Sequence, residues 1–160
     1  MVASMSAVPA QPASAPSELC PVAFQDFHSP DPFPLELGGV LPGLTLRYET
    51  YGTLLPDKSN AILVPHALSG DHHGAGRYSP DDPKPGWWDH FVGPGKAIDT
   101  DRFFVIGVNC IGGCRGSTGP LSIDPRTGQR FGGFFPEITL GDIVRGQRMV
   151  VRHLGITKLH

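Results

Sequence analysis

The stretch "RFFVIGVN", residues 102–109, decides the fold of this chain. It is a short continuous apolar run, and a second run, "AILVP" at residues 61–65, precedes it. Such runs are typical of strands that are buried on both faces, as in the parallel part of an α/β sheet. The two runs therefore predict two central strands, each of which leads directly into a loop.

A helix is predicted after the second run. Thr139 and Asp142 form a capping-box pattern at its start, and Gly155 is a typical stop. The order strand, loop, strand, loop, helix, with a further strand beginning after the helix, predicts an α/β protein whose crossovers join strands of one sheet. The apolar face of the helix is predicted from residues at helical spacing: Leu140, Ile143, Val144, Gln147, Val150, Val151 and Leu154.

The amino-terminal region divides into two parts. Residues 1–32 begin with an Ala/Ser/Pro-rich segment and continue with prolines, so they predict a disordered tail. This segment has neither the basic start nor the apolar run of a signal peptide or a membrane span. Residues 33–52 alternate apolar and polar side chains on either side of a Gly/Pro turn, which predicts a β-hairpin.

Composition narrows the class of partner. A chain of 160 residues suffices for one domain, and its net charge is −2 with scattered basic residues. This balance argues against nucleic acid or a membrane surface as partner and favours a small ligand. The 21 glycines and 17 prolines predict long ordered loops, which often carry sites. Three cysteines at irregular spacing, Cys20, Cys110 and Cys114, favour free thiols in a reducing cytoplasm.

Cys114 is a candidate nucleophile because residues 112–116, "GGCRG", match the glycine-x-nucleophile-x-glycine pattern. A nucleophile elbow requires a sharp turn from a strand into a helix. The following residues include Gly119, Pro120 and Pro125, which prevent a helix from starting there. A loop cysteine is therefore the favoured interpretation.

A metal site is a second alternative. Cys110 and Cys114 are separated by three residues, and His66, His72 and His73 lie in the first long loop. A structural zinc site takes four ligands in paired spacing, and these residues match no such pattern. Hydrogen-bonded loop histidines are the favoured interpretation, and no metal is expected.

The loop "HALSG", residues 66–70, follows the first buried run. Ser69 lacks the preceding glycine and the following helix of a nucleophile. In α/β-hydrolase folds, however, the loop after the third strand donates a backbone N–H to the oxyanion hole. This loop lies in the corresponding place.

Four blocks in this order resemble the homoserine O-acetyltransferase family of the α/β-hydrolase superfamily. They are "GLTLRYETYG" (43–52), "AILVPHALSGDHH" (61–73), "GWWDHFVGPGKAIDTDRFFVIGVNCIGGCRGSTGPLSIDP" (86–125) and "FPEITLGDIVRGQRMVVRHLGI" (135–156). The resemblance implies the amino-terminal part of an α/β-hydrolase fold, a mostly parallel sheet with an N-terminal hairpin, with residues 33–160 as a partial domain.

The resemblance also implies an activity. Members of this family transfer acetyl from acetyl-CoA to the L-homoserine hydroxyl in methionine biosynthesis, through a serine nucleophile. That serine and the Asp and His of the triad are expected beyond His160, so the 160-residue chain is expected to be inactive by itself. No resident cofactor is expected, acetyl-CoA is the co-substrate, and a cytoplasmic homodimer is expected for the full-length protein.

Site residues follow from the same resemblance. The backbone of Leu68 is expected in the oxyanion hole, and the other candidates for substrate binding are Ala67, Ser69, Gly70, Asn109, Arg115 and Thr118. Two alternatives stay open: a serine or homoserine O-succinyltransferase of the same family, and a catalytically inactive fragment that acts by interaction.

Overall fold

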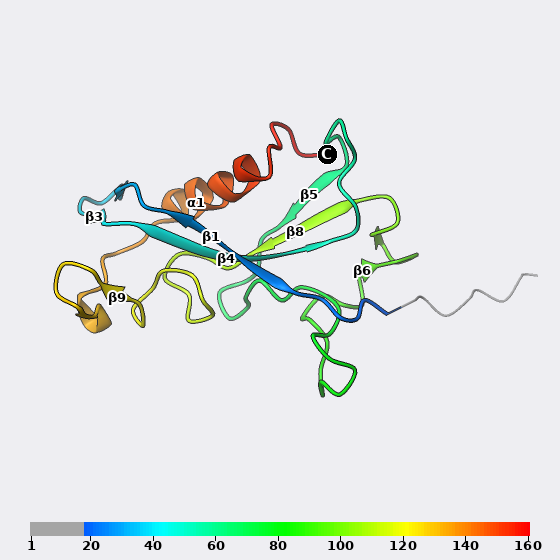
Figure 1. The fold of residues 1–160 in the computed structure, drawn as a ribbon, viewed down its shortest axis with the longest axis horizontal. Coiled ribbons are helices and arrows are strands. Elements are labelled where there is room, and N and C mark those ends of the chain that lie inside the picture. The colour runs from blue at the N-terminus through cyan, green and yellow to red at the C-terminus, as the bar shows by residue number, and fades with distance from the viewer. Residues whose placement is uncertain (1–17) are drawn as a thin grey trace, which may run out of the picture.

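The structure is a computed structural model that describes residues 18–160. A four-stranded sheet forms its centre, in the order β1 (Phe24–Ser29), β4 (Leu44–Tyr51), β8 (Phe104–Val108) and β5 (Ala61–Val64) (Figure 1). The pair β5–β8 is parallel, whereas β1–β4 and β4–β8 are antiparallel. The predicted α/β class is confirmed, and the parallel part of the described sheet is the pair formed by the two apolar runs.

The central strand β8 is buried along its whole length, as the continuous apolar run predicts. Its side chains alternate between two cores, with Ile106 on one face and Val105 on the other. Gly107 lies where a loop crosses the sheet, and a Cβ atom at this position would come within 2.6 Å of the His72 carbonyl oxygen. A glycine is therefore required for this close approach.

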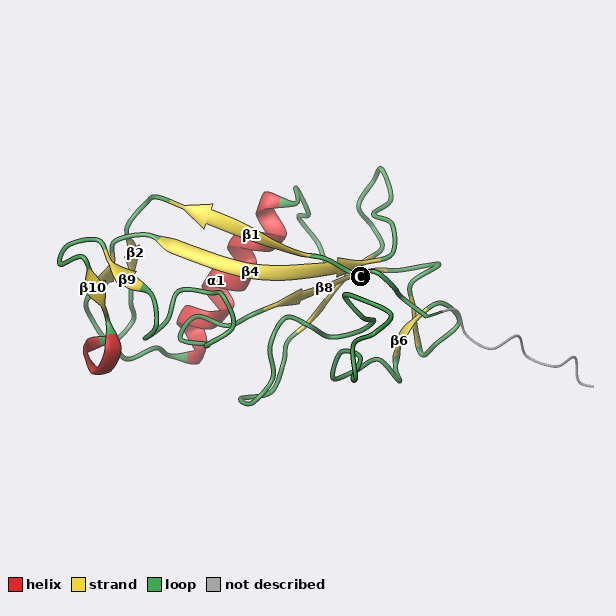
Figure 2. Cartoon of the chain, turned by 60° about the horizontal axis from the view of Figure 1, so that its bottom comes forward, coloured by secondary structure: helices red, strands yellow, loops and turns green. Residues whose placement is uncertain are grey.

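The helix α1 (Leu140–His153) lies across one face of the sheet (Figure 2). Its predicted start is confirmed, because the Thr139 hydroxyl accepts from the Asp142 N–H while the Asp142 carboxylate accepts from the Thr139 N–H. The predicted stop is also confirmed, since Gly155 has a left-handed φ of 71°. Val150 and Val151 bury the inner face of the helix against the sheet.

Loops cover the opposite face of the sheet. A second core forms there from Tyr51, Val64, Ala75, Val92 and Val105. The loops also contain three short two-stranded pairs: β2 (Phe33–Pro34) with β3 (Val40–Leu41), β6 (Val92–Gly93) with β7 (Ile98–Asp99), and β9 (Ile123–Asp124) with β10 (Gln129–Arg130). A 3₁₀ turn, Gly132–Phe134, precedes the helix.

The predicted disordered tail is wrong in part. Residues 1–17 lie outside the described residues, but β1 falls within the range 1–32 and pairs with β4 over its full length. The side chains of this edge strand are mostly exposed, so it shows no apolar alternation. Cross-strand contacts hold it instead, including the ion pair of Asp26 with Arg47 at 2.8 Å.

The predicted hairpin over residues 33–52 is correspondingly wrong in its pairing. Its second half is the strand β4, as expected, but the partner of β4 is β1. The first half contributes β2 and β3, which pair with each other over two residues. Leu35 is nevertheless buried in the main core, so the apolar pattern in this half reflects packing in an irregular segment.

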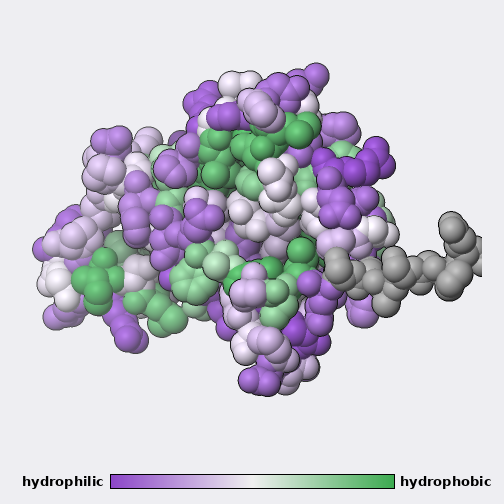
Figure 3. Space-filling view, turned by 45° about the vertical axis from the view of Figure 1, so that its right-hand side comes forward, coloured by the Kyte–Doolittle hydropathy of each residue, from purple (hydrophilic) through white to green (hydrophobic). Residues whose placement is uncertain are grey.

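Several large apolar side chains remain exposed. Hydrophobic surface gathers in patches between polar areas on the face shown in Figure 3. The exposed side chains include Leu68, Phe134, Leu140 and Val144. Among residues 18–160, no helix combines the length and apolar character needed to cross a bilayer.

Asp142 is expected to contribute strongly to stability. Its fully buried carboxylate caps α1, accepts from the Glu36 N–H at 3.1 Å and pairs with Arg145. Burial opposes ionisation, but the hydrogen bonds from Thr139, Arg145 and Glu36 prevail and lower the pKa of Asp142. Replacing Asp142 with Asn, which cannot carry the charge, is expected to cost about 1–3 kcal/mol of unfolding free energy at pH 7.

The sign of the pH dependence follows from this lowered pKa. The stabilisation is present above the unfolded value, about 3.9, and is lost as pH falls through the lower folded pKa. Urea unfolding between about pH 6 and pH 2 should therefore show a shallower acid loss for Asp142→Asn than for the wild type. Asp31→Asn, at an exposed site without a polar contact in the described chain, is the control. Parallel pH profiles for wild type and Asp142→Asn would contradict this expectation.

Candidate functional site

Two loops meet at one edge of the sheet. The loop of residues 65–70 follows β5, and the loop of residues 109–118 follows β8. Because β5 and β8 are parallel, their carboxyl ends lie at the same edge, where ligands bind in open α/β sheets. Sequence order alone separates these loops by about forty residues, and the parallel pairing brings them together.

His66 joins the two loops. Its Nε2 accepts from the Cys110 N–H at 3.0 Å, and its Nδ1 lies 2.7 Å from the Ala67 carbonyl oxygen. A carbonyl oxygen only accepts, so Nδ1 carries the proton and Nε2 does not. His66 is therefore a neutral imidazole in this arrangement, and it holds the two loops at a fixed separation.

A cavity of about 760 Å³ lies between these loops and the first half of α1. This volume is within the range of small-molecule sites, and the lining is mostly apolar. The lining includes the predicted residues Ala67, Leu68, Ser69, Gly70 and Arg115, together with Cys110, Ile111, Ile138, Val144 and Gln147. The structure thus brings together five of the seven predicted site residues.

The backbone of Leu68 lies within a tight turn on the cavity wall. The N–H of Gly70 donates to the Ala67 carbonyl oxygen at 2.8 Å, which closes a tight turn with Leu68 inside it. Within residues 18–160, no acceptor hydrogen-bonds to the Leu68 N–H. The Leu68 side chain is fully exposed and is not packed into the core of the protein.

Asn109 and Thr118 lie outside the cavity lining. Thr118 accepts from the Thr45 N–H through its hydroxyl at 2.8 Å and donates its own N–H to the Thr45 carbonyl oxygen. Asn109 donates its N–H to Arg47, and its carbonyl oxygen accepts from the Ser117 hydroxyl at 2.7 Å. Both residues fix the second loop onto β4. The buried side-chain amide of Asn109 has no hydrogen-bond partner in the described chain.

Cys114 stands in an irregular loop and not in a strand-to-helix turn. The next regular helix, α1, begins 26 residues later, at Leu140. The Cys114 thiol is exposed, and across residues 18–160 no serine hydroxyl or cysteine thiol hydrogen-bonds to a histidine ring. The neighbouring Cys110 is half-buried, and burial raises the pKa of its thiol. Neither cysteine has the surroundings of an activated nucleophile.

The histidines considered as metal ligands turn to different partners. His66 binds the Cys110 amide, whereas His72 and His73 lie beside Glu49 at 3.6 and 3.1 Å. In the described part of the chain, no three His, Cys, Asp or Glu side chains are grouped to hold a metal ion.

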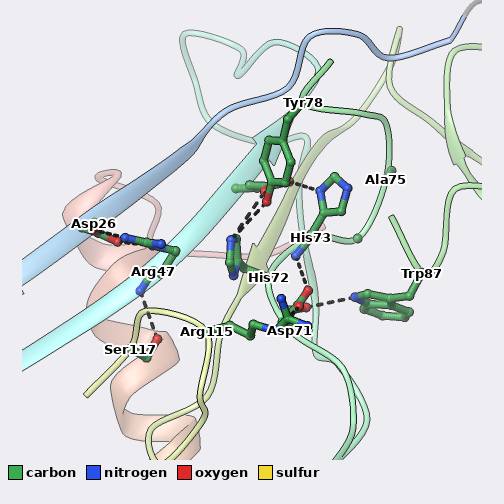
Figure 4. A network of polar contacts seen from close by, with 12 residues as sticks. Asp26, Arg47, Asp71, His72, His73, Ala75, Tyr78, Trp87, Arg115 and Ser117 are labelled. Carbon is green, nitrogen blue, oxygen red and sulfur yellow. Dashed lines mark hydrogen bonds and ion pairs between the residues drawn. The ribbon is translucent and has the colours of Figure 1, made fainter. Parts of the chain in front are cut away.

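A buried polar network surrounds Glu49, and the loop residues that take part in it are drawn in Figure 4. Glu49 on β4 is fully buried and accepts from Tyr51 at 2.6 Å, from Tyr78 and from His73. Burial, followed by the hydrogen bond and charge of Glu49, raises the pKa of Tyr78, and burial lowers the pKa of His72. This network attaches residues 72–78 to the sheet.

Sequence reasoning missed this network. Glu49 stands on the strand face that also carries Tyr51, so an acidic residue among buried positions was the available signal. Its partners His72, His73 and Tyr78 come from an irregular loop whose path the sequence pattern does not predict.

The second loop meets the first at Asp71. The Nε atom of Arg115 lies 3.6 Å from the Asp71 carboxylate, and Asp71 also accepts from the His73 N–H at 2.9 Å. The indole N–H of Trp87 donates to the Asp71 carbonyl oxygen at 2.9 Å. Asp71 therefore connects the buried network around Glu49 to the rim of the cavity (Figure 4).

No family model matches the chain. Known proteins nevertheless match it closely. The chain is 59% identical over 125 residues to a homoserine O-acetyltransferase of Geobacter sulfurreducens, covering 78% of this chain and 34% of that protein. It is 56% identical over 133 residues to a homoserine O-succinyltransferase of Magnetococcus marinus, covering 83% of this chain and 34% of that protein.

Solved structures agree with these relatives. The homoserine O-acetyltransferase of Bacillus anthracis superposes with a TM-score of 0.81 at 38% identity, over 89% of this chain and 39% of that chain. Esterase E22 superposes with a TM-score of 0.80 at 43% identity, over 86% of this chain and 39% of that chain.

The fold and the meeting of its two loops define a segment of an α/β-hydrolase. More narrowly, the resemblance to homoserine O-acetyltransferases seen in the sequence is confirmed. The chain spans about a third of the length of the curated relatives that it matches.

Proposed function

We propose that the protein transfers acetyl from acetyl-CoA to the hydroxyl of L-homoserine, in methionine biosynthesis, and that this chain supplies one wall of its acyl site. The observation that carries the proposal is the turn of residues 67–70, which presents the Leu68 N–H without an acceptor at the edge of a largely apolar cavity. Such a donor stabilises the oxyanion that forms when an acyl carbonyl is attacked.

The co-substrates follow from the class of relatives. Acetyl-CoA is the proposed donor and L-homoserine the proposed acceptor, with no resident cofactor, since acyl transfer through an enzyme nucleophile needs none. A homodimer is proposed for the full-length protein by the same analogy. The three free thiols favour a reducing cytoplasm as its location.

We propose further that the 160-residue chain does not turn over by itself. Covalent acyl transfer needs a nucleophile paired with a base, and the described residues contain no serine or cysteine paired with a histidine. The purified chain should release no O-acetylhomoserine above background, as measured by chromatography. Turnover that disappears in Cys114→Ser would contradict this proposal and would identify Cys114 as a nucleophile.

A segment exchange tests the function itself. The matched residues of this chain replace the corresponding segment of the Geobacter sulfurreducens relative, and the chimera is assayed with acetyl-CoA or succinyl-CoA and with L-homoserine or L-serine. The proposal expects acetyl transfer to homoserine at a rate within about tenfold of the parent enzyme, because the two segments are 59% identical. A folded chimera without acyl transfer would reject the proposal.

A second candidate function is transfer of succinyl, which the Magnetococcus marinus relative favours at similar identity. The same assay separates the two candidates, because each chimera reaction contains a single acyl donor. Faster turnover with succinyl-CoA would replace acetyl by succinyl in the proposal.

A further inference from the structure

Arg115 differs from every other residue that lines the cavity. Of the lining residues in the described chain, it alone carries a formal charge, because His66 is held as a neutral imidazole. The other lining residues are glycines or have apolar or uncharged polar side chains. A single cation at the rim of such a cavity gives a ligand one fixed point of charge recognition.

The guanidinium of Arg115 forms one long ion pair and no hydrogen bond with the described chain. Its nearest carboxylate, Asp71, lies at 3.6 Å, which is too long for a hydrogen bond, and 73% of the Arg115 side chain is exposed. By contrast, Arg47 and Arg126 each bind a neighbouring aspartate at 2.8 Å. Arg115 forms no hydrogen bond within residues 18–160, so its donors are open to a ligand.

Carboxylates are the ligands that suit this arrangement. A guanidinium presents paired N–H donors that match the two oxygens of a carboxylate, and the pair gains strength beside an apolar wall. We propose that Arg115 binds the carboxylate of a substrate and so determines which substrates enter the cavity. This proposal rests on the proposed acyl transfer only for the identity of the ligand.

Two substrates of the proposed reaction class could supply the carboxylate. One is the α-carboxylate of the amino-acid acceptor, and the other is the terminal carboxylate of a succinyl donor. An acetyl group has no such anion. The source of the carboxylate at Arg115 therefore bears on donor selectivity as well as on binding.

Asp71 acts against the ligand in this proposal. Its carboxylate occupies the side of Arg115 that faces the first loop, and it would repel an incoming anion. Asp71→Asn keeps the acceptor for the His73 N–H but removes the charge. This substitution should therefore tighten carboxylate binding, opposite in direction to the loss of Arg115.

Calorimetric titration of the full 160-residue chain tests the proposal. The ligands are L-homoserine, L-homoserine amide, succinate and succinamide, so each carboxylate has an uncharged counterpart. Arg115→Gln should weaken binding of at least one carboxylate by about tenfold or more. The wild type should bind the corresponding amide about as weakly as Arg115→Gln binds the carboxylate. Asp71→Asn should tighten the same carboxylate. Arg130→Gln, on an exposed strand outside the cavity, is the matched control.

The outcomes separate the proposal from the proposed function. If Arg115→Gln loses affinity for L-homoserine alone, the site belongs to the acceptor. If it loses affinity for succinate alone, the site belongs to a succinyl donor. Three results would overturn the proposal. One is a wild type that binds acids and amides equally, and another is an Arg115→Gln variant that binds the carboxylates as tightly as the wild type does. The third is no binding by a wild-type chain that is folded by near-ultraviolet circular dichroism. An inactive chimera with intact Arg115-dependent binding would reject acyl transfer and leave the carboxylate site standing.

Discussion

Replacing Leu68 with Pro in the chimera is expected to lower kcat by about 100-fold to 1,000-fold, the usual cost of losing one oxyanion-hole donor. Proline has no backbone N–H, so the substitution removes the proposed donor. The Leu68 side chain is fully exposed, and its removal costs no core packing. The loss should fall on kcat more than on KM, because the oxyanion exists in the transition state and not in the bound substrate.

Leu68→Ala is the matched control for this experiment, since it truncates the side chain and keeps the N–H. Its kcat should stay within a few-fold of the chimera, and both variants should keep the thermal unfolding midpoint. Equal losses of kcat in the two variants would assign Leu68 a side-chain role. A kcat of Leu68→Pro within a few-fold of the chimera would remove its amide from the mechanism.

Replacing Glu49 with Ala should cost about 3–5 kcal/mol of unfolding free energy, because each buried donor left without its acceptor costs about 1–3 kcal/mol. Glu49 is fully buried and accepts from Tyr51, Tyr78 and His73. Its removal leaves these donors without their acceptor and opens a cavity beneath residues 72–78. Urea unfolding of the chain at pH 7 measures the change.

Glu137→Ala is the control for Glu49→Ala, because Glu137 is exposed and makes no polar contact within residues 18–160. It should change the unfolding free energy by less than about 0.5 kcal/mol. Glu49→Gln preserves shape and one acceptor oxygen and should cost less than Glu49→Ala. A loss below about 1 kcal/mol for Glu49→Ala would show that the network contributes little to the fold.

The elements that the sequence predicts well are those whose signals are local or strongly apolar. The capping box at Thr139 and Asp142 satisfies helix-end donors from within four residues, so α1 is visible without its surroundings. The run at β8 has no polar residue because both faces of the strand are covered. These signals predicted the two layers of the fold.

Strand β1 shows the limit of that reasoning. Most of its side chains are exposed, Asp26 forms an ion pair with Arg47 on β4, and Phe27 alone packs against the main core, so the strand has no periodic pattern. The position of β1 in the sheet depends on its pairing with β4. A sequence pattern in residues 24–29 alone therefore could not distinguish an edge strand from a tail.

The candidate site divides in a similar way. The turn of residues 67–70 was predicted from its place after a buried strand, and the structure puts it on the cavity wall with Arg115. Asn109 and Thr118 come from the same second loop, but both hydrogen-bond to β4 and neither lines the cavity. Side-chain direction in an irregular loop depends on long-range contacts that spacing does not encode.

The most direct test of the proposed acyl transfer is the product ratio of the chimera with acetyl-CoA and saturating L-homoserine. A transferase delivers the acyl group to the homoserine hydroxyl, whereas an esterase delivers it to water. One structural neighbour is named esterase E22. Chromatographic quantification should find O-acetylhomoserine in excess over free acetate. Acetate as the main product, from a chimera whose parent forms O-acetylhomoserine, would contradict the proposed function of this segment.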